Sequence, residues 1–322
     1  MASPPSAPAG LDAPDVPQHV EVVRRFNRSY TQRIGVLEES FLGLGMPLGT
    51  ARLLYEIGVE AGTTRDLRAR LQLDSGYLSR LLRRLESDAL VSVEPDPDDR
   101  RRRRVHLTPA GRRAWDELER RSGERARRLV APLTDRQRAR LAAALAEADL
   151  LVRAATVRIE QVEPTDPAAL AAVRAYVDEL DERFPGGFAV GDLAAGTEGL
   201  RAPDGAFVVA TSDGVPVACG GVQPLGGGAG EIKRTWVHPE WRGAGLGSRL
   251  LRHLEGVAGD LGHTTVRLDT NGTLAEAVAM YERAGYRAVE RYNDNPHATH
   301  FFAKDLHDRP PGGEGYARTH GF

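Results

Sequence analysis

The chain has 322 residues, of which 41% are hydrophobic and 27% charged, and its formal net charge is −2. This length favours two domains, and no apolar run approaches the ~18 residues that a membrane-spanning helix needs, so we expect no membrane contact. The single cysteine, Cys219, excludes an intrachain disulfide and fits a reducing cytoplasm, the location we expect.

Charge is distributed unevenly along the chain. Residues 1–155 hold 27 arginines and no lysine against 22 acidic residues, a surplus of five positive charges. Residues 156–322 hold 16 basic residues against 23 acidic ones, a surplus of seven negative charges. A basic half and an acidic half indicate two functions, one of which involves a polyanion.

The elements expected in chain order change character near residue 155. Residues 1–17 are rich in Pro, Ser and Ala and lack the order of a signal peptide, so we predict a disordered tail. Apolar residues then recur at helical spacing, which predicts an all-α unit over residues 18–155. Residues 156–306 alternate short strands with helices, which predicts an α/β unit, and residues 307–322 are predicted to be a flexible tail.

A helix–turn–helix pattern lies in the basic half. We predict a short helix over Thr63–Leu71 and, after a turn, a second helix over Ser75–Ser87. The second helix has one apolar face, formed by Leu78, Leu81, Leu82 and Leu85. Its opposite face is polar and fits the DNA major groove; it carries Ser75, Tyr77, Ser79, Arg80, Arg83 and Arg84.

A β-hairpin with a basic tip is expected next. Two β-prone arms, Leu90–Glu94 and Arg103–Leu107, flank an Asp/Pro turn and the five consecutive arginines Arg100–Arg104. Such a ribbon can straddle a phosphate backbone or place an arginine in the minor groove. The alternative for the arginine run alone is a solvated charged face.

Residues 20–150 resemble the MarR-type winged-helix regulators. The resemblance lies in SGYLSRLLRRLESDALV, in DPDDRR at the wing tip and in LTPAGRRAW after it. Asp96, Asp99 and Arg101 match the usual wing pattern Asp-x-Arg-Asp-x-Arg, whereas Asp98 replaces its first arginine. The resemblance implies a homodimer on a palindromic double-stranded operator, with Asp99 and Arg101 added to the DNA-binding residues. A winged helix that only dimerises is the alternative.

A glycine-rich loop opens a predicted helix in the acidic half. The stretch WRGAGLGSRLL places Gly243, Gly245 and Gly247 between a strand and the helix that follows. Its spacing is neither the dinucleotide-binding fingerprint nor a Walker loop. Exposed amides at residues 243–248 and the helix N-terminus predict a pyrophosphate guest, with Arg242 as a charged contact. An ordinary loop is the alternative.

Residues 156–306 resemble the GNAT superfamily of N-acetyltransferases. The loop matches the signature Q/R-x-x-G-x-G/A, and EIKRTWVHPEWRGAGLG and AVAMYERAGYRAVERY match its flanks. The resemblance implies a mixed, centrally splayed sheet in which Glu231–Val237 and Thr265–Asp269 separate to admit acetyl-CoA. The implied cofactor-binding residues are Trp236, Val237, Arg242, Gly243, Gly245, Gly247, Ser248 and Asn271.

Acyl transfer to an amine needs a base, an oxyanion donor and a group that supports the departing thiolate. We predict Glu231 as the base, a backbone N–H near Val237 as the donor and Tyr281 as the acid. The alternatives are a surface carboxylate for Glu231, a core residue for Tyr281 and a simple turn for Asn271. The nine histidines lack metal-ligand spacing, so no metal is expected.

We therefore interpret the chain as a DNA-binding regulator fused to an acetyl-CoA-dependent N-acetyltransferase. Its acceptor would be a small-molecule amine or a protein lysine, and the segment Asp178–Leu200 is expected to shape the acceptor site. The alternative is a transcription factor whose second unit senses acetyl-CoA or an amine without turnover.

Overall fold

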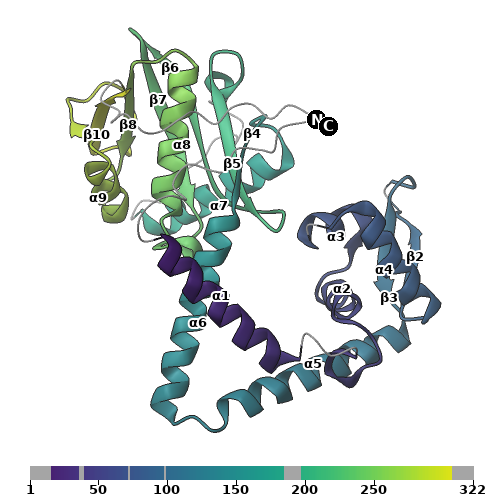
Figure 1. Cartoon of the computed structure of the whole chain (residues 1–322). Coiled ribbons are helices and arrows are strands. Elements are labelled where there is room, and N and C mark those ends of the chain that lie inside the picture. Colours follow the sequence, from purple (N-terminus) through teal and green to yellow (C-terminus); the bar gives the residue numbers. More distant parts are fainter. Residues whose placement is uncertain (1–15, 36–39, 72, 98, 185–196, 307–322) are drawn as a thin grey trace, which may run out of the picture. The chain divides into compact units, whose positions relative to one another are not determined.

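The computed structural model divides the chain into two compact units, residues 1–143 and 144–322 (Figure 1). It describes residues 16–35, 40–71, 73–97, 99–184 and 197–306. The first helix begins at Val16, and the remaining residues predicted as tails, 1–15 and 307–322, lie outside the described ranges. Among the described residues, no helix is both long and apolar enough to cross a membrane.

The first unit is mainly helical, with one small sheet. Its elements are α1 (Val16–Ile34), η1 (Phe41–Gly43), α2 (Leu48–Val59), β1 (Gly62–Thr63), α3 (Thr64–Leu71), α4 (Ser75–Ser87), β2 (Val91–Pro95), β3 (Arg103–Leu107), α5 (Pro109–Val130) and α6 (Asp135–Thr156), the last of which runs past residue 143. The sheet is antiparallel in the order β1–β3–β2, with Val93 opposite Val105. The order α3, α4 and a two-stranded hairpin is the predicted winged helix–turn–helix, which the structure confirms.

Helix α4 forms where its leucine pattern predicts it. The Asp74 side chain caps the helix by accepting a hydrogen bond of 2.8 Å from the Tyr77 amide. One face is buried in the core with α2 and α3; its residues are Leu78, Leu81, Leu82 and Leu85. This burial fixes which face of α4 remains available to solvent.

The second unit is an α/β domain. After the end of α6 it contains β4 (Arg158–Val162), α7 (Pro167–Arg183), η2 (Glu198–Leu200), β5 (Ala206–Ser212), β6 (Val215–Gly226), β7 (Ala229–Val237), η3 (Pro239–Trp241), α8 (Leu246–Asp260), β8 (Thr265–Thr270), α9 (Ala275–Arg283), β9 (Arg287–Ala288) and β10 (His300–Asp305). Seven strands pair in the order β4–β5–β6–β7–β8–β10–β9. Only the β7–β8 pair is parallel among these described strands.

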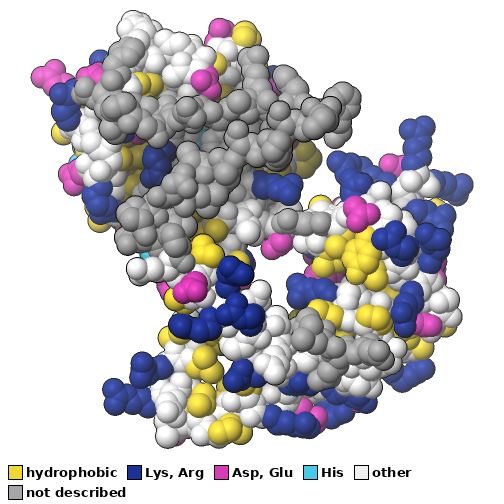
Figure 2. Space-filling view, in the orientation of Figure 1, with side chains coloured by type: hydrophobic (Ala, Val, Ile, Leu, Met, Phe, Trp, Pro, Cys, Tyr) yellow, Lys and Arg dark blue, Asp and Glu magenta, His cyan; other side chains and the backbone are white. Residues whose placement is uncertain are grey.

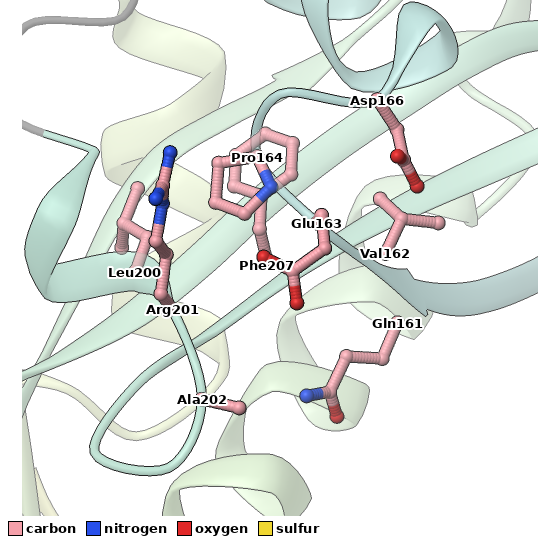
Figure 3. A pocket seen from close by; sticks show the side chains of 9 residues that line it. All are labelled: Gln161, Val162, Glu163, Pro164, Asp166, Leu200, Arg201, Ala202 and Phe207. Atoms are coloured by element: carbon pink, nitrogen blue, oxygen red, sulfur yellow. The ribbon is translucent and has the colours of Figure 1, made fainter.

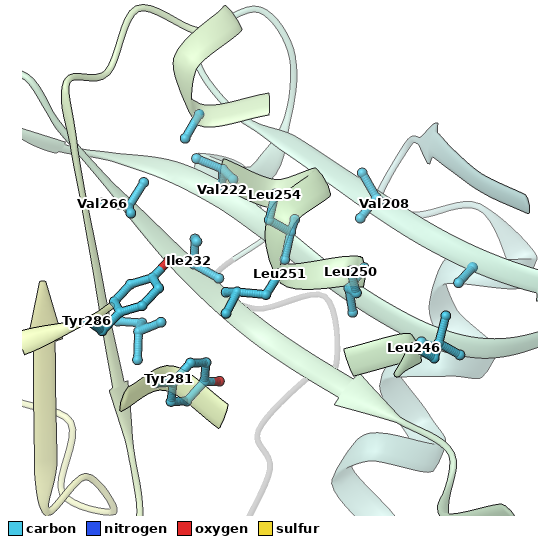
Figure 4. Packing of buried hydrophobic residues seen from close by; sticks show 14 of the residues in the cluster. Val208, Val222, Ile232, Leu246, Leu250, Leu251, Leu254, Val266, Tyr281 and Tyr286 are labelled. Carbon is cyan, nitrogen blue, oxygen red and sulfur yellow. The ribbon is translucent and has the colours of Figure 1, made fainter. Parts of the chain in front are cut away.

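Apolar side chains cover both faces of this sheet. Helix α8 packs on one face, where Leu250, Leu251 and Leu254 meet Val222 and Ile232 (Figure 4). Helix α7 packs on the other face against strand residues that include the fully buried Cys219. Neighbouring residues of β6 such as Ala218 and Cys219 therefore face different helices.

The sheet opens between β7 and β8. Their parallel ladder pairs Ala229–Glu231 with Thr265–Arg267 and extends no further, although both strands continue. The structure thus confirms the predicted mixed and centrally splayed sheet, with Glu231 and Arg267 at the last rung. Beyond this rung, no ladder pairing joins β7 to β8.

Candidate functional site

The glycine loop joins the end of β7 to α8. Gly243 and Gly245 have φ of 83° and 77°, a left-handed conformation that favours glycine. A Cβ at either position would meet no atom within 4 Å, so the space beside both residues is open. Gly245 is the N-cap of α8 and provides no side-chain cap, which leaves the first amides of α8 facing the loop. Ser248 lies in this first turn and is half-buried.

Gly247 serves packing rather than conformation. Its φ is not in the left-handed region, and a Cβ there would approach the Met280 sulfur of α9 to 3.0 Å. Glycine is therefore required at the three positions of the motif for two different physical reasons. Two permit the turn, and the third permits α8 and α9 to approach each other.

Arg242 is held by a carboxylate of α7. Its Nη2 lies 2.6 Å from both oxygens of Glu179, and its Nε and Nη2 also donate to the Val237 carbonyl. The Trp236 indole donates to the same Glu179 at 2.9 Å. Burial alone would raise the pKa of Glu179, but hydrogen bonds from Arg242, Trp236 and Arg183 outweigh it and hold the pKa below its usual value. Sequence reasoning missed Glu179, although it lies in the segment expected to shape the acceptor site.

Strand β7 contains a bulge close to the loop. The ladder with β6 jumps from Gly221–Lys233 to Cys219–Trp236, so two residues of β7 face Gly220 alone. The first of them, Arg234, has φ of 54°, a conformation that a non-glycine residue rarely adopts. Such a bulge re-aims backbone groups just before Trp236 and Val237, where an oxyanion donor was predicted. Trp236 itself is buried and packs against α7 residues.

Glu231 is a buried carboxylate, 2% exposed. It accepts hydrogen bonds from Gln223 at 2.8 Å and from Asn293 at 2.9 Å, and it pairs with Lys233 at 3.2 Å. The alternative of a surface carboxylate is therefore wrong. Asn293 also bonds Asp269 of β8 at 3.0 Å, so the structure joins two carboxylates that the sequence analysis did not connect.

Tyr281 of α9 is both a core residue and a neighbour of β7. Its ring is 5% exposed and packs at an angle against Tyr286 and Phe302. Burial raises the pKa of Tyr281 to about 12, although a hydrogen bond with the Thr235 side chain opposes the shift. Thr235 belongs to the bulge, so the phenol faces the strand that carries Glu231.

Asn271 follows β8 and folds the chain locally. Its Nδ2 donates to the His297 carbonyl at 2.7 Å, and its Oδ1 accepts from the Thr273 amide at 2.9 Å. Both ends of the carboxamide are thus used within the chain, which supports the turn interpretation over a direct cofactor contact. In the part of the chain that the structure describes, no group of three or more metal-ligating side chains gathers.

The polar face of α4 is exposed as predicted. Its side chains lie opposite the buried leucines; the exposed ones are Ser75, Tyr77, Ser79, Arg80, Arg83 and Arg84. The Arg80 guanidinium lies over the Tyr77 ring at 5.5 Å, and Arg83 Nε bonds the Ser79 carbonyl. The exposed face of α4 therefore carries the arginine guanidinium groups and the Tyr77 phenol together.

The hairpin tip is shaped by aspartates. Asp99 accepts from the Arg101 amide at 3.0 Å and pairs with Arg102, while the buried Asp96 accepts from the Asp99 amide. These contacts give Asp99 a role in shaping the turn that presents the exposed Arg101, which differs from a direct contact with DNA. Figure 2 shows basic side chains gathered around this end of the hairpin. Asp98 lies outside the described residues.

A pocket of about 350 Å³ lies elsewhere in the second unit, at the β4–α7 connection (Figure 3). Its lining mixes apolar and charged groups: Gln161, Val162, Glu163, Pro164, Asp166, Leu200, Arg201, Ala202 and Phe207. It includes none of the residues predicted for acetyl transfer. Residues 185–196 of the predicted acceptor segment lie outside the described ranges.

Comparisons with known proteins identify both units. The acetyltransferase (GNAT) family model matches residues 173–286, and the MarR family model matches residues 44–102. An "IAA acetyltransferase" of Azospirillum brasilense is 35% identical over 118 residues, which cover 36% of this chain and 76% of that protein. The chain belongs to the acetyltransferase (GNAT) family. Ahead of its GNAT domain it carries a MarR-family domain.

Other similar proteins cover one unit each. An uncharacterised N-acetyltransferase of Schizosaccharomyces pombe is 38% identical over 96 residues, so the match spans 29% of this chain and 59% of that relative. A putative acyl-CoA N-acyltransferase from Klebsiella pneumoniae has 29% identity and a TM-score of 0.40 over 47% of this chain and 99% of its own. A mutant MarR from Escherichia coli, solved with operator DNA, has 25% identity and a TM-score of 0.35, and the match covers 41% of this chain and 95% of that protein.

Cys219 in the GNAT domain is expected to be unreactive in the native protein. Its side chain is 0% exposed on β6, and burial raises the pKa of its thiol to about 12, so very little thiolate forms at pH 8. A colorimetric thiol titration should find almost none before unfolding and one thiol per chain in denaturant. Rapid labelling of the native protein would contradict this burial.

Proposed function

We propose that the GNAT domain transfers the acetyl group of acetyl-CoA to an amine and that the MarR-family domain binds double-stranded DNA as a homodimer. The observation that carries the enzymatic part is the position of Glu231. It is a buried carboxylate at the last rung before β7 and β8 separate, on the strand that leads into the glycine loop.

The glycine loop fits the diphosphate of acetyl-CoA. The open space beside Gly243 and Gly245 leaves their backbone accessible, and the uncapped first turn of α8 supplies N–H donors and partial positive charge. Arg242 adds a guanidinium within the same loop. The gap between β7 and β8 would then accept the pantetheine arm beside Trp236 and Val237.

The residues around this gap meet the needs of acyl transfer. Glu231 takes a proton from the ammonium, directly or through water, because an alkyl amine of pKa ~10 is mostly charged at pH 7. The amine nitrogen bonds to the thioester carbon, and a backbone N–H near Val237 stabilises the oxyanion. The C–S bond then breaks with its electron pair on sulfur, and the nitrogen gives up its second proton to the departing thiolate or to water.

Tyr281 supports the departing sulfur chiefly as a hydrogen-bond donor. A phenol with a pKa of about 12 keeps its proton near neutral pH, but it is a weaker acid than a thiol of pKa ~8.5. Full proton transfer to the thiolate is therefore uphill, and donation of a hydrogen bond suffices to stabilise the leaving group. This refines the predicted role of Tyr281 as an acid.

The enzymatic proposal is tested by titration calorimetry with acetyl-CoA and by thiol release with a panel of primary amines and lysine peptides. Saturable binding together with amine-dependent thiol release supports it. Binding without release for every amine would favour the sensor alternative, and no binding at millimolar acetyl-CoA would overturn both.

The DNA-binding proposal predicts different effects for two arginines. Arg83→Ala, on the exposed face of α4, should lower affinity for the operator by about 1–3 kcal/mol and relax its sequence preference. Arg101→Ala, at the hairpin tip, should weaken binding to all sequences and reduce the slope of log affinity against log salt by about one. Gel shifts at several salt concentrations measure both.

The control for these variants is Arg52→Ala. Arg52 is exposed on α2 and pairs with Glu56, so its loss removes one positive charge that belongs to neither α4 nor the hairpin. Equal losses in all three variants would indicate a general charge effect and would contradict the proposed interface.

The homodimer proposal rests on an exposed apolar face of α1. Val20, Val23, Phe26 and Tyr30 recur at helical spacing and are 44%, 66%, 49% and 37% exposed. We expect Val23→Asp to shift the protein from dimer to monomer in light scattering across a concentration series. The control is Val215→Asp, at a valine of the GNAT domain that is 60% exposed, and it should leave the protein a dimer in the same measurement. A wild-type monomer at high concentration would overturn the proposal.

A further inference from the structure

The connection between β9 and β10 carries asparagines that the sequence analysis left unexplained. Asn293 and Asn295 alternate in the stretch YNDNPH and point the same way. The Asn293 Nδ2 donates to Glu231 Oε1 at 2.9 Å and to Asp269 Oδ2 at 3.0 Å. Asn295 Nδ2 donates to Asp269 Oδ2 at 2.8 Å and forms no hydrogen bond with Glu231. One carboxamide therefore joins β7 to β8 near the point where their ladder ends.

The Asn293 carboxamide is itself fixed in place. Its Oδ1 accepts from the Asn295 amide at 3.2 Å, so its Nδ2 must face the carboxylates. Arg291 donates to the carbonyls of Asn293 and Asn295 at 2.9 and 2.8 Å, and its guanidinium lies over the Phe301 ring of β10. These contacts pre-organise the donor before any ligand binds.

The charged surroundings make this donor important. Glu231 faces Lys233 at 3.2 Å, and the ring of Tyr292 lies under the Arg267 guanidinium. Burial, followed by the nearby Glu231 and Asp269, raises the pKa of Tyr292, which therefore stays neutral. The buried Glu231 and the partly buried Asp269 thus share the Asn293 amide as a common donor. Its removal would leave them facing each other without that donor.

We propose that Asn293 is a positioning residue for acetyl transfer: it fixes the Glu231 carboxylate against Asp269 in the orientation that accepts the proton of the amine. The inference rests on the proposed function, since it assigns Asn293 a role only through Glu231. Asn293 need not touch the substrate. Its effect belongs to the chemical step and not to amine or acetyl-CoA binding.

The matched variants are Asn293→Ala and Asn295→Ala, which remove neighbouring carboxamides of the same loop. Asn293→Ala should lower kcat about tenfold to a hundredfold, because a small misplacement of a reacting group has effects of that size. The KM values for the amine and for acetyl-CoA should change less than about threefold. Asn295→Ala loses hydrogen bonds to Asp269 and from the His297 amide but none to Glu231, so it should keep kcat within about threefold of wild type.

Two further readouts separate positioning from a general structural effect. In a variant that already carries Glu231→Gln, adding Asn293→Ala should lower kcat by less than about twofold, since the carboxylate through which Asn293 acts is gone. Thermal unfolding of each variant checks that the fold is retained.

The outcomes are distinguishable. If wild type releases thiol but Asn293→Ala matches Asn295→Ala, or changes only the amine KM, the positioning role is overturned and the proposed function stands. An additive effect in the Glu231→Gln background also overturns it. If wild type binds acetyl-CoA but acetylates no amine, both the proposed function and this inference fail.

Discussion

Glu231→Gln should lower kcat/KM for the amine by about 10²- to 10⁴-fold at pH 7, the usual contribution of a general base. Glutamine keeps the shape of the side chain but cannot take the proton. The defect should shrink as the pH rises toward ~10, because the amine then loses its proton to solvent. Thiol release measured from pH 6 to 10 tests both the size of the loss and its pH dependence.

The control for this variant is Glu240→Gln, which removes an exposed carboxylate in the β7–α8 connection and should leave the rate unchanged. Acetyl-CoA affinity, measured by calorimetry, should be the same in Glu231→Gln as in wild type. A variant that keeps activity within about threefold at every pH would show that another group, or water alone, removes the proton.

Gly245→Val should weaken acetyl-CoA binding by about tenfold or more. The residue has φ of 77°, where a branched side chain costs about 1–2 kcal/mol, and its Cβ would project into the open space assigned to the diphosphate. Calorimetry with acetyl-CoA and with CoA measures the change, and both ligands should be affected alike because they share the diphosphate.

Gly214→Val separates backbone strain from loss of the site. Gly214 lies in the β5–β6 turn with φ of 81°, and its Cβ would likewise meet no atom within 4 Å. The variant should lose a similar amount of stability in thermal unfolding and keep its affinity for acetyl-CoA. Equal losses of affinity in both variants would assign the effect to strain and would argue against a diphosphate at the loop.

Regular elements could be predicted because their signals are local. The leucine spacing of α4 predicted a helix over Ser75–Ser87, and short strands alternating with helices predicted the α/β unit after residue 155. The glycine loop could also be predicted from the sequence, since a backbone with positive φ favours glycine. The separation of β7 and β8 came from family resemblance rather than from any local pattern.

The contacts that complete the site could not be predicted, because they join residues distant in sequence. Asn293 lies 62 positions from Glu231, and Glu179 lies 63 positions from Arg242. The bulge at Arg234 gave no signal either, because arginine is not a residue type that marks a left-handed conformation. The Asn-Asp-Asn stretch is the single local clue that could have prompted a search.

The ion pair between Glu179 and Arg242 means that the loop never presents a vacant guanidinium. Under the proposed binding mode, the incoming diphosphate must share that cation or exchange places with the Glu179 carboxylate. Its affinity is therefore a difference between two competing partners and not the full strength of either one. Side chains on α7 that never meet the ligand can thus adjust how tightly it is retained.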